Sequence, residues 1–286
     1  MTARLGRADL HLHTLASDGT TGVVELLEQV EAAGELDVVA ITDHERIDAA
    51  LAGRALARSR GMRVEVVVGE EVTTLGGHLL ALYLEERIPS LRSMRSTIAA
   101  VHEQGGLAIP AHPFFPYPMC VTPRTLRRLI ADPDPAHRPD GVESFNPTAF
   151  GRPPHGRVVA FAHEHGLSQI GGSDAHTLDA IGRCWTTFPG RSAEDLRRAI
   201  LDGTTHAHGS FHGASQVGTF GRQLRKYGRD ARDELTGRLR RTGTGRDHGY
   251  PGGRSRPPRF VHPEELAEPP SMSTPHPLEQ GGAGSR

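Results

Sequence analysis

The first 176 residues contain histidines and carboxylates whose types and spacing suit metal binding. His11 and His13 lie two residues apart in the run DLHLHT, so an extended chain would point both imidazoles to the same face. Two imidazoles on one side of a strand can chelate one cation, although such a pair is weak evidence by itself. Residues of the same types lie beside later apolar runs, and they supply the further candidates Asp43, His44, Glu70, His78, His112, Asp174 and His176.

The chemistry of this set favours divalent metal ions. Imidazole and carboxylate ligands without thiolate suit Mn²⁺, Zn²⁺ or Fe²⁺ better than they suit a sulfur-rich structural zinc site. The only cysteines, Cys120 and Cys184, form no CxxC pair. The nine candidates exceed the four ligands of one tetrahedral ion, so we expect two or three ions that share a bridging carboxylate. Glu70, at the end of an apolar run, is the predicted bridge.

The elements that must position these residues can be predicted from the alternation of short apolar runs with longer amphipathic stretches. Strands are expected at 8–13, 37–42, 63–70, 78–84, 107–111, 141–145 and 168–172. Helices are expected at 23–33, 49–60, 91–104, 123–131, 156–165 and 193–201. The third and fourth strands are separated only by a turn, which predicts a hairpin. The predicted fold is α/β, a distorted (β/α)7 TIM-like barrel with the candidate residues at the C-terminal ends of its strands.

Composition divides the 286 residues near position 205. Residues 1–205 are predicted to form one folded domain with a formal charge of −6. Residues 206–286 carry +5 and contain too few apolar side chains to offset the entropy lost on ordering. We therefore expect a largely disordered, basic tail rich in Gly, Pro and Arg, with one short helix near 216–241. The formal net charge of the whole chain, −1, is the sum of an acidic domain and a basic tail.

Six motifs of the predicted domain resemble those of the PHP (polymerase and histidinol phosphatase) domain family. They are DLHLHTLASDG, AITDH, GEEVTTLGGH, AIPAHP, GVESFN and GGSDAHTLDAIG, which match in order, type and approximate spacing over about residues 8 to 188. Proteins similar to these include phosphatases of small metabolites and nucleotides, 5′-to-3′ exonucleases and polymerase-associated proofreading modules. The resemblance implies that residues 1–205 are a metal-dependent phosphoesterase domain.

The resemblance also implies how the ligands divide among three ions. The first ion would be held by His11, His13, Glu70 and Asp174. The second would share Glu70 and take His78 and His112. The third would take Asp18, His44 and His176. The family often has a histidine at the position of Asp18, so the carboxylate here is a departure that bears on metal identity and on occupancy of the third site.

Phosphoester hydrolysis is the reaction that such a site favours, because divalent ions activate a bound water and clamp phosphoryl oxygens. We expect a metal-activated hydroxide to attack phosphorus, with Asp43, Asp174 and His176 as the catalytic groups that manage protons. Four residues are candidates for contact with substrate: Glu143, Asn146, Arg152 and Arg183. The substrate is expected to be an ester of a small metabolite, a nucleotide or an oligonucleotide end.

Two other interpretations stay open. Amidohydrolase-type barrels, including TatD-like metal nucleases, also begin with an HxH pair and end with a strand-terminal aspartate. Many use a carboxylated lysine as the bridge, and the only lysine here is Lys226 in the predicted tail, so only a carboxylate-bridged variant would fit. A non-catalytic PHP binding module is the second interpretation, against which the full set of ligand positions argues.

The sequence also favours a cytoplasmic protein without a membrane partner. No run of about 18 apolar residues occurs, and the N-terminus lacks the apolar stretch of a signal peptide. The expected partner is a small phosphorylated substrate or nucleotide. The basic stretch 222–241 is a candidate for weak nucleic-acid contact, although acidic residues interrupt it and a solvated tail is the favoured interpretation. The oligomeric state is left open.

Overall fold

The computed structural model describes residues 5–116, 119–148 and 152–211. From position 212 onward the predicted tail lies outside the described residues, together with the helix expected near 216–241 and the basic stretch 222–241. Within the described part, no helix is both long enough and apolar enough to cross a membrane.

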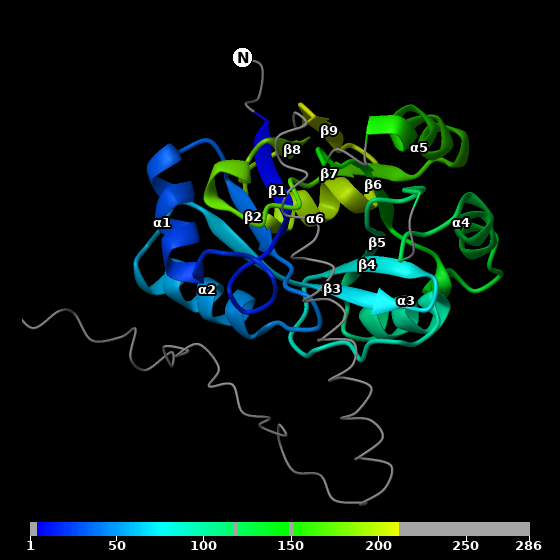
Figure 1. Cartoon of the computed structure of the whole chain (residues 1–286), viewed down its shortest axis with the longest axis horizontal. Helices are drawn as coiled ribbons and strands as arrows, with labels where there is room; N and C mark the ends of the chain where they lie inside the picture. The colour runs from blue at the N-terminus through cyan, green and yellow to red at the C-terminus, as the bar shows by residue number, and fades with distance from the viewer. Residues whose placement is uncertain (1–4, 117–118, 149–151, 212–286) are drawn as a thin grey trace, which may run out of the picture.

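Most strands belong to one curled sheet in the order β5-β4-β3-β2-β1-β8-β9, while β6 and β7 form a separate parallel pair (Figure 1). The central strands β1, β2 and β3 are parallel, and β4, β5, β8 and β9 each pair antiparallel with their neighbours. The strand bounds are β1 Gly6–Leu12, β2 Val38–Ile41, β3 Glu65–Thr74, β4 Gly77–Leu82, β5 Leu107–Pro110, β6 Gly141–Phe145, β7 Ser168–Gly171, β8 Cys184–Phe188 and β9 His206–Gly209.

The β6–β7 pair completes a distorted barrel by contacting both sides of the curled sheet. The backbone N–H of Asp140, just before β6, donates to the carbonyl of Ala108 in β5 over 3.0 Å. On the other side, the N–H of Gly171 in β7 donates to the Thr186 hydroxyl of β8 over 2.9 Å. The segment after β7 forms a parallel bridge with the end of β1. The carboxyl ends of these strands therefore meet at one rim of the barrel.

Two hydrophobic cores lie on the two faces of the sheet. The outer core packs the β2 residues Val39 and Ile41 against α1, and the inner core packs Leu10 against Phe188 and the α6 residue Leu196. Helix α6 begins where the Ala193 N–H donates to Glu65 at the start of β3. It thus closes the end of the barrel opposite the rim. The helices are α1 Val23–Ala33, α2 Asp48–Ser59, α3 Met94–Glu103, α4 Pro123–Ile130, α5 Arg152–His165 and α6 Ala193–Leu201.

The barrel agrees with the predicted fold class, and the third and fourth strands form the predicted hairpin. Two strands, β8 and β9, were not predicted. The run CWTTF is short and mixed, and HAHG is a polar edge strand, so neither shows the periodicity of an isolated strand. Strand β8 forms because it pairs with β1, and β9 forms because it pairs with β8. Strand β9 lies at 206–209, just beyond the predicted boundary at 205.

One corner of the fold should make stability depend on pH. His102 Nε2 lies 2.8 Å from Asp140 Oδ2, which also accepts the Ala108 N–H, so this pair fastens α3 to the junction of β5 and β6. The hydrogen bond to Asp140 raises the pKa of His102 against the opposing effect of burial. Because the pKa is higher in the folded state, the stabilisation is fully present below about pH 6.5, the unfolded value, and is lost as pH rises through the folded pKa.

Replacement of His102 by Gln should therefore lower the free energy of unfolding most in acid solution. Urea titrations between about pH 5 and pH 9 measure this, and the difference between the two proteins should shrink steadily as pH rises. A difference that is constant over the whole range would contradict the assignment.

Candidate metal centre

Glu71 of β3 lies at the centre of a buried group of imidazoles. Its Oε1 lies 2.8 Å from Nδ1 of His78 and 3.0 Å from Nε2 of His112. Its Oε2 lies 3.1, 3.2 and 3.4 Å from the nearest nitrogens of three further rings, those of His11, His13 and His44 respectively. One carboxylate thus faces two separate sets of histidines, as a ligand shared by two metal ions would.

Two aspartates extend the cluster on the other side of His13. Asp174 Oδ1 lies 3.3 Å from Nε2 of His13 and 3.6 Å from Nε2 of His11. Asp18 Oδ1 lies 3.4 Å from Nδ1 of His13, and its Oδ2 lies 3.0 Å from Nε2 of His176. Every ligand that the family resemblance implies, except Glu70, therefore lies in this one cluster.

The cluster fits divalent metal ions on three observations. It divides into four overlapping groups of possible ligands, and in each group the ligand atoms lie within 4.8 Å of one another. The donor set is imidazole and carboxylate, which suits Mn²⁺, Zn²⁺ or Fe²⁺. The Nε2 of His13 is buried without a well-formed hydrogen bond, yet it faces the oxygens of Glu71 and Asp174 at 3.2 and 3.3 Å. An ion between these atoms would satisfy all three.

The backbone at the rim is held in uncommon conformations where it presents ligands. His112 follows β5 with φ of 29°, and Asp174 follows β7 with φ of 51°. Positive φ is uncommon for residues other than glycine, and it persists where the surrounding structure fixes it, often at functional sites. The His112 N–H donates to Glu143 Oε2 over 2.6 Å, so a buried carboxylate holds that turn.

Charges within the cluster oppose the effects of burial. Burial alone would raise the pKa of Glu71, but the surrounding imidazoles, with His44 and His78 first among them, lower it well below its usual range. Burial alone would lower the pKa of His13, but nearby carboxylates, with Asp18 first, raise it to about 10. The carboxylates therefore stay ionised. Protons balance them in the metal-free protein, and metal binding must release protons.

The structure places Glu71, and not the predicted Glu70, among the imidazoles of the cluster. Glu70 points to the outer face of β3, where its Oε2 accepts the Ile88 N–H over 2.7 Å. Side chains alternate along a strand, so Glu70 and Glu71 cannot face the same side. The hairpin register pairs Thr73 with His78, which places Glu71, two residues before Thr73, on the face of His78.

Asp43 is engaged by the loop that follows β1. Its Oδ1 accepts the Thr14 N–H over 2.7 Å and the Ser17 N–H over 3.1 Å, and its Oδ2 accepts the Thr14 hydroxyl over 2.7 Å. These contacts fix the loop that carries Asp18. Both oxygens of Asp43 therefore position this loop, and its predicted part in proton transfer stays a prediction.

The four predicted substrate residues divide into two pairs. Glu143 Oε1 lies 2.9 Å from Nδ1 of His11, and Asn146 Nδ2 lies 3.2 Å from Asp174 Oδ2, so both lie within the cluster and orient its ligands. In contrast, the contacts of Arg152 and Arg183 lie elsewhere. Arg152 stacks over Phe211, and Arg183 donates to the carbonyl of Asp179. Neither of these contacts is with a residue of the cluster, and contact of either arginine with substrate stays a prediction.

Sequence reasoning missed two residues at the site. The first is Glu71, which the hairpin register could have identified. The second is Cys120, whose Sγ lies 3.2 Å from Nδ1 of His112, on the side of the ring away from Glu71. No local sequence pattern predicts this position for Cys120. The loop that carries it folds back onto β4, where the His78 N–H donates to the carbonyl of Met119.

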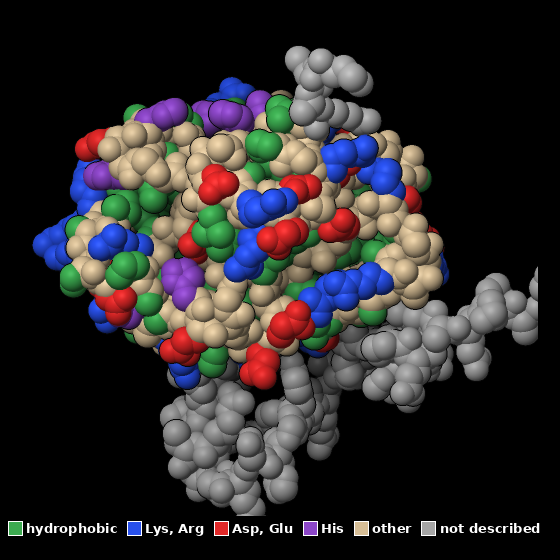
Figure 2. Space-filling view, turned by 180° about the vertical axis from the view of Figure 1, so that it is seen from behind, with side chains coloured by type: hydrophobic (Ala, Val, Ile, Leu, Met, Phe, Trp, Pro, Cys, Tyr) green, Lys and Arg blue, Asp and Glu red, His purple; other side chains and the backbone are tan. Residues whose placement is uncertain are grey.

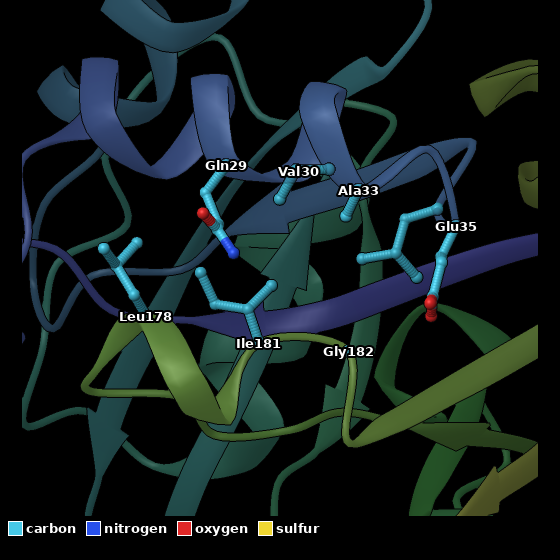
Figure 3. A pocket seen from close by; sticks show the side chains of 8 residues that line it. Gln29, Val30, Ala33, Glu35, Leu178, Ile181 and Gly182 are labelled. Atoms are coloured by element: carbon cyan, nitrogen blue, oxygen red, sulfur yellow. The ribbon is translucent and has the colours of Figure 1, made fainter.

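A small cavity lies apart from this cluster, between α1 and the 3-10 helix η2 (Leu178–Ala180) (Figure 3). Its volume is about 60 Å³, and its walls include Val30, Ala33, Leu178 and Ile181. Gln29 and Glu35 also line it, but none of the candidate metal ligands does.

Known proteins place the chain in a family. The family model described as PHP-associated matches residues 153–205. An uncharacterized protein of Methanocaldococcus jannaschii is 38% identical over 151 residues, which is 49% of this chain and 81% of that protein. A solved two-domain protein of Bacteroides vulgatus, containing a predicted PHP-like metal-dependent phosphoesterase, has a TM-score of 0.59 at 19% identity over 73% of this chain and 66% of that one. This chain belongs to the PHP domain family.

A further relative of this PHP protein has a stated activity. A 5′-3′ exoribonuclease of Haemophilus influenzae is 29% identical over 105 residues, which is 35% of this chain and 37% of that enzyme. The Bacteroides vulgatus protein is described as containing a predicted metal-dependent phosphoesterase, and in the described part of this chain the cluster around Glu71 offers ligand groups for metal ions.

Proposed function

We propose that this PHP protein is a metal-dependent phosphoesterase whose substrates are nucleotides or the ends of oligonucleotides. The observation that carries the proposal is the central position of Glu71 between two sets of imidazoles. The exoribonuclease relative supports the nucleotide class of substrate.

The residues present would hold three ions in the way the family resemblance implies, with Glu71 in place of Glu70. The first ion would lie between His11, His13, Asp174 and Glu71, and the second between Glu71, His78 and His112. The third would take His13 or His44 with Asp18 and His176. Divalent ions at such a site supply Lewis acidity toward phosphoryl oxygens and lower the pKa of bound water.

The other residues prepare the ligands. Glu143 accepts a hydrogen bond from Nδ1–H of His11, so Nε2 of that ring faces Glu71. This hydrogen bond raises the basicity of Nε2 as a metal ligand. Asn146 holds the outer oxygen of Asp174. We propose that Asp174 and His176 handle protons during turnover, because their side chains are slightly exposed whereas His11 is fully buried. A leaving group at the rim can exchange protons with side chains that are accessible there, and a fully buried ring is not.

The proposal predicts hydrolysis that depends strictly on metal. The full chain should be stripped with a chelator and assayed with Mn²⁺, Zn²⁺ or Fe²⁺ against p-nitrophenyl phosphate, bis-p-nitrophenyl phosphate, histidinol phosphate, nucleoside monophosphates, 3′,5′-bisphosphates and short oligonucleotides. Activity should vanish with the chelator and return with at least one metal, most strongly on the nucleotide substrates. A folded, metal-loaded protein that hydrolyses none of them would leave only a binding role.

A further inference from the structure

A basic surface lies beside the metal centre on helix α4. The exposed side of this helix carries Arg124, Arg127 and Arg128 and no acidic residue, and the nearby Arg92 precedes α3. Figure 2 shows Arg side chains gathered on the flank of the molecule where α4 lies, at the left of that view. We call Arg92, Arg124 and Arg128 the arginine flank.

The charges of the arginine flank are uncompensated. Nearby Arg95 is paired with Asp132 over 2.6 Å, and Arg127 lies 5.3 Å above the Phe161 ring. No ion pair with a described carboxylate involves any of the three arginines of the flank, and all three are exposed. Three exposed cations that form no such ion pair create a local positive potential although the whole chain is nearly neutral.

The β3–β4 hairpin connects this flank to the metal centre. Its tip packs against the starts of both helices, since a Cβ at Gly76 would lie 3.2 Å from Met94 Cβ and 3.8 Å from Thr125 Cγ2. The N–H of Leu75 donates to the carbonyl of Arg92 over 2.8 Å. His78, two residues beyond Gly76 and roughly 7 Å away by strand rise, faces Glu71. Arg92 of the flank thus contacts the same hairpin that carries His78, one of the residues proposed to hold the second ion.

We propose that the arginine flank binds the phosphodiester backbone of a single-stranded oligonucleotide whose terminal phosphate enters the metal centre. This inference rests on the proposed function and extends it to the polymer. A small phosphate ester cannot reach both the buried Glu71 and the surface of α4, whereas successive phosphates of a strand can. A flexible single strand is required because the ligands around Glu71 are almost wholly buried.

The test uses the full chain. The arginines beyond residue 211 are then present in every variant and contribute equally to binding. The probe is a fluorescein-labelled, 5′-phosphorylated single strand of about 12 nucleotides, and binding is followed by anisotropy over a range of salt concentrations. The double variant Arg124→Gln/Arg128→Gln is compared with Arg58→Gln/Arg60→Gln, which removes equal charge at the far end of α2.

The flank variant should bind about tenfold more weakly, and its slope of log affinity against log salt should fall by about 0.7 for each arginine removed. Its metal content should equal that of the unmodified chain, and the α2 variant should bind normally. Unchanged affinity and slope, or an equal loss in the α2 variant, would overturn the inference. If the inference is overturned but the unmodified chain hydrolyses small phosphate esters, the proposed function is retained. Flank-dependent binding without any hydrolysis would retain the inference and reject the enzyme.

Discussion

Replacement of Glu71 by Gln is expected to remove bound metal and to reduce phosphoesterase activity at least about 100-fold. Loss of a residue that only hydrogen-bonds a metal ligand already costs up to about 100-fold, and Glu71 is itself a proposed ligand. The Glu71 carboxylate faces five imidazoles through its two oxygens. An amide of the same shape offers one acceptor oxygen and an NH₂ group that cannot bind a metal ion. Elemental analysis of the purified variant measures the loss directly.

The neighbouring residue provides a matched control. Glu70→Gln makes the same chemical change one position earlier, on the outer face of β3, where Glu70 accepts the Ile88 N–H. This variant should keep its metal, although it should unfold at lower urea concentration. Circular dichroism must show that Glu71→Gln is folded, since five imidazoles lose their shared counter-charge. Metal loss in Glu70→Gln with retention in Glu71→Gln would restore the bridge predicted from the sequence.

Replacement of Gly172 by Ala is expected to destabilise the fold and the metal centre together. A Cβ at this position would lie 2.5 Å from His11 Cβ and 2.7 Å from Glu143 Oε1. These distances are too short for any real contact, so the end of β7 must move away from β1 and take His11 and Glu143 with it. Overpacking of this kind costs about 1–3 kcal/mol. Urea unfolding should show the loss, and the folded fraction should bind less metal.

Gly156→Ala is the control for the added methyl group. Gly156 lies in α5, and a Cβ there would meet nothing within 4 Å. Alanine in a helix is favoured over glycine by up to about 1 kcal/mol, so this variant should be slightly more stable and should keep its metal. If Gly172→Ala were as stable and as metal-rich as Gly156→Ala, the close packing of His11 against β7 would be wrong.

Strand-end placement explains why most of the site could be predicted from the sequence. His11 and His13 are two residues apart, so a single strand determines that both rings share a face, and both indeed contact Glu71. The parallel arrangement then brings the ends of separate strands to one rim. The choice between Glu70 and Glu71 depends instead on pairing register, and a one-residue error moves a side chain to the other face of the sheet.

Other features depend on contacts that local sequence does not encode. The position of Asp43 at a strand end predicts a group that handles protons, but the sequence does not show that the loop after β1 folds over this carboxylate and donates hydrogen bonds to it. Strand β8 exists because it pairs with β1 and β9, not because CWTTF is strongly strand-forming. Tertiary pairing of this kind overrides local preference.

The most direct test of the central claim is a titration of the chelator-stripped full chain with Mn²⁺, in which bound metal per chain and hydrolysis of a phosphate ester are measured in the same samples. A shared Glu71 predicts that more than one ion binds per chain and that hydrolysis appears only as the second ion is bound. Binding of a single ion with full activity, or full occupancy without hydrolysis, would contradict a multinuclear phosphoesterase centre.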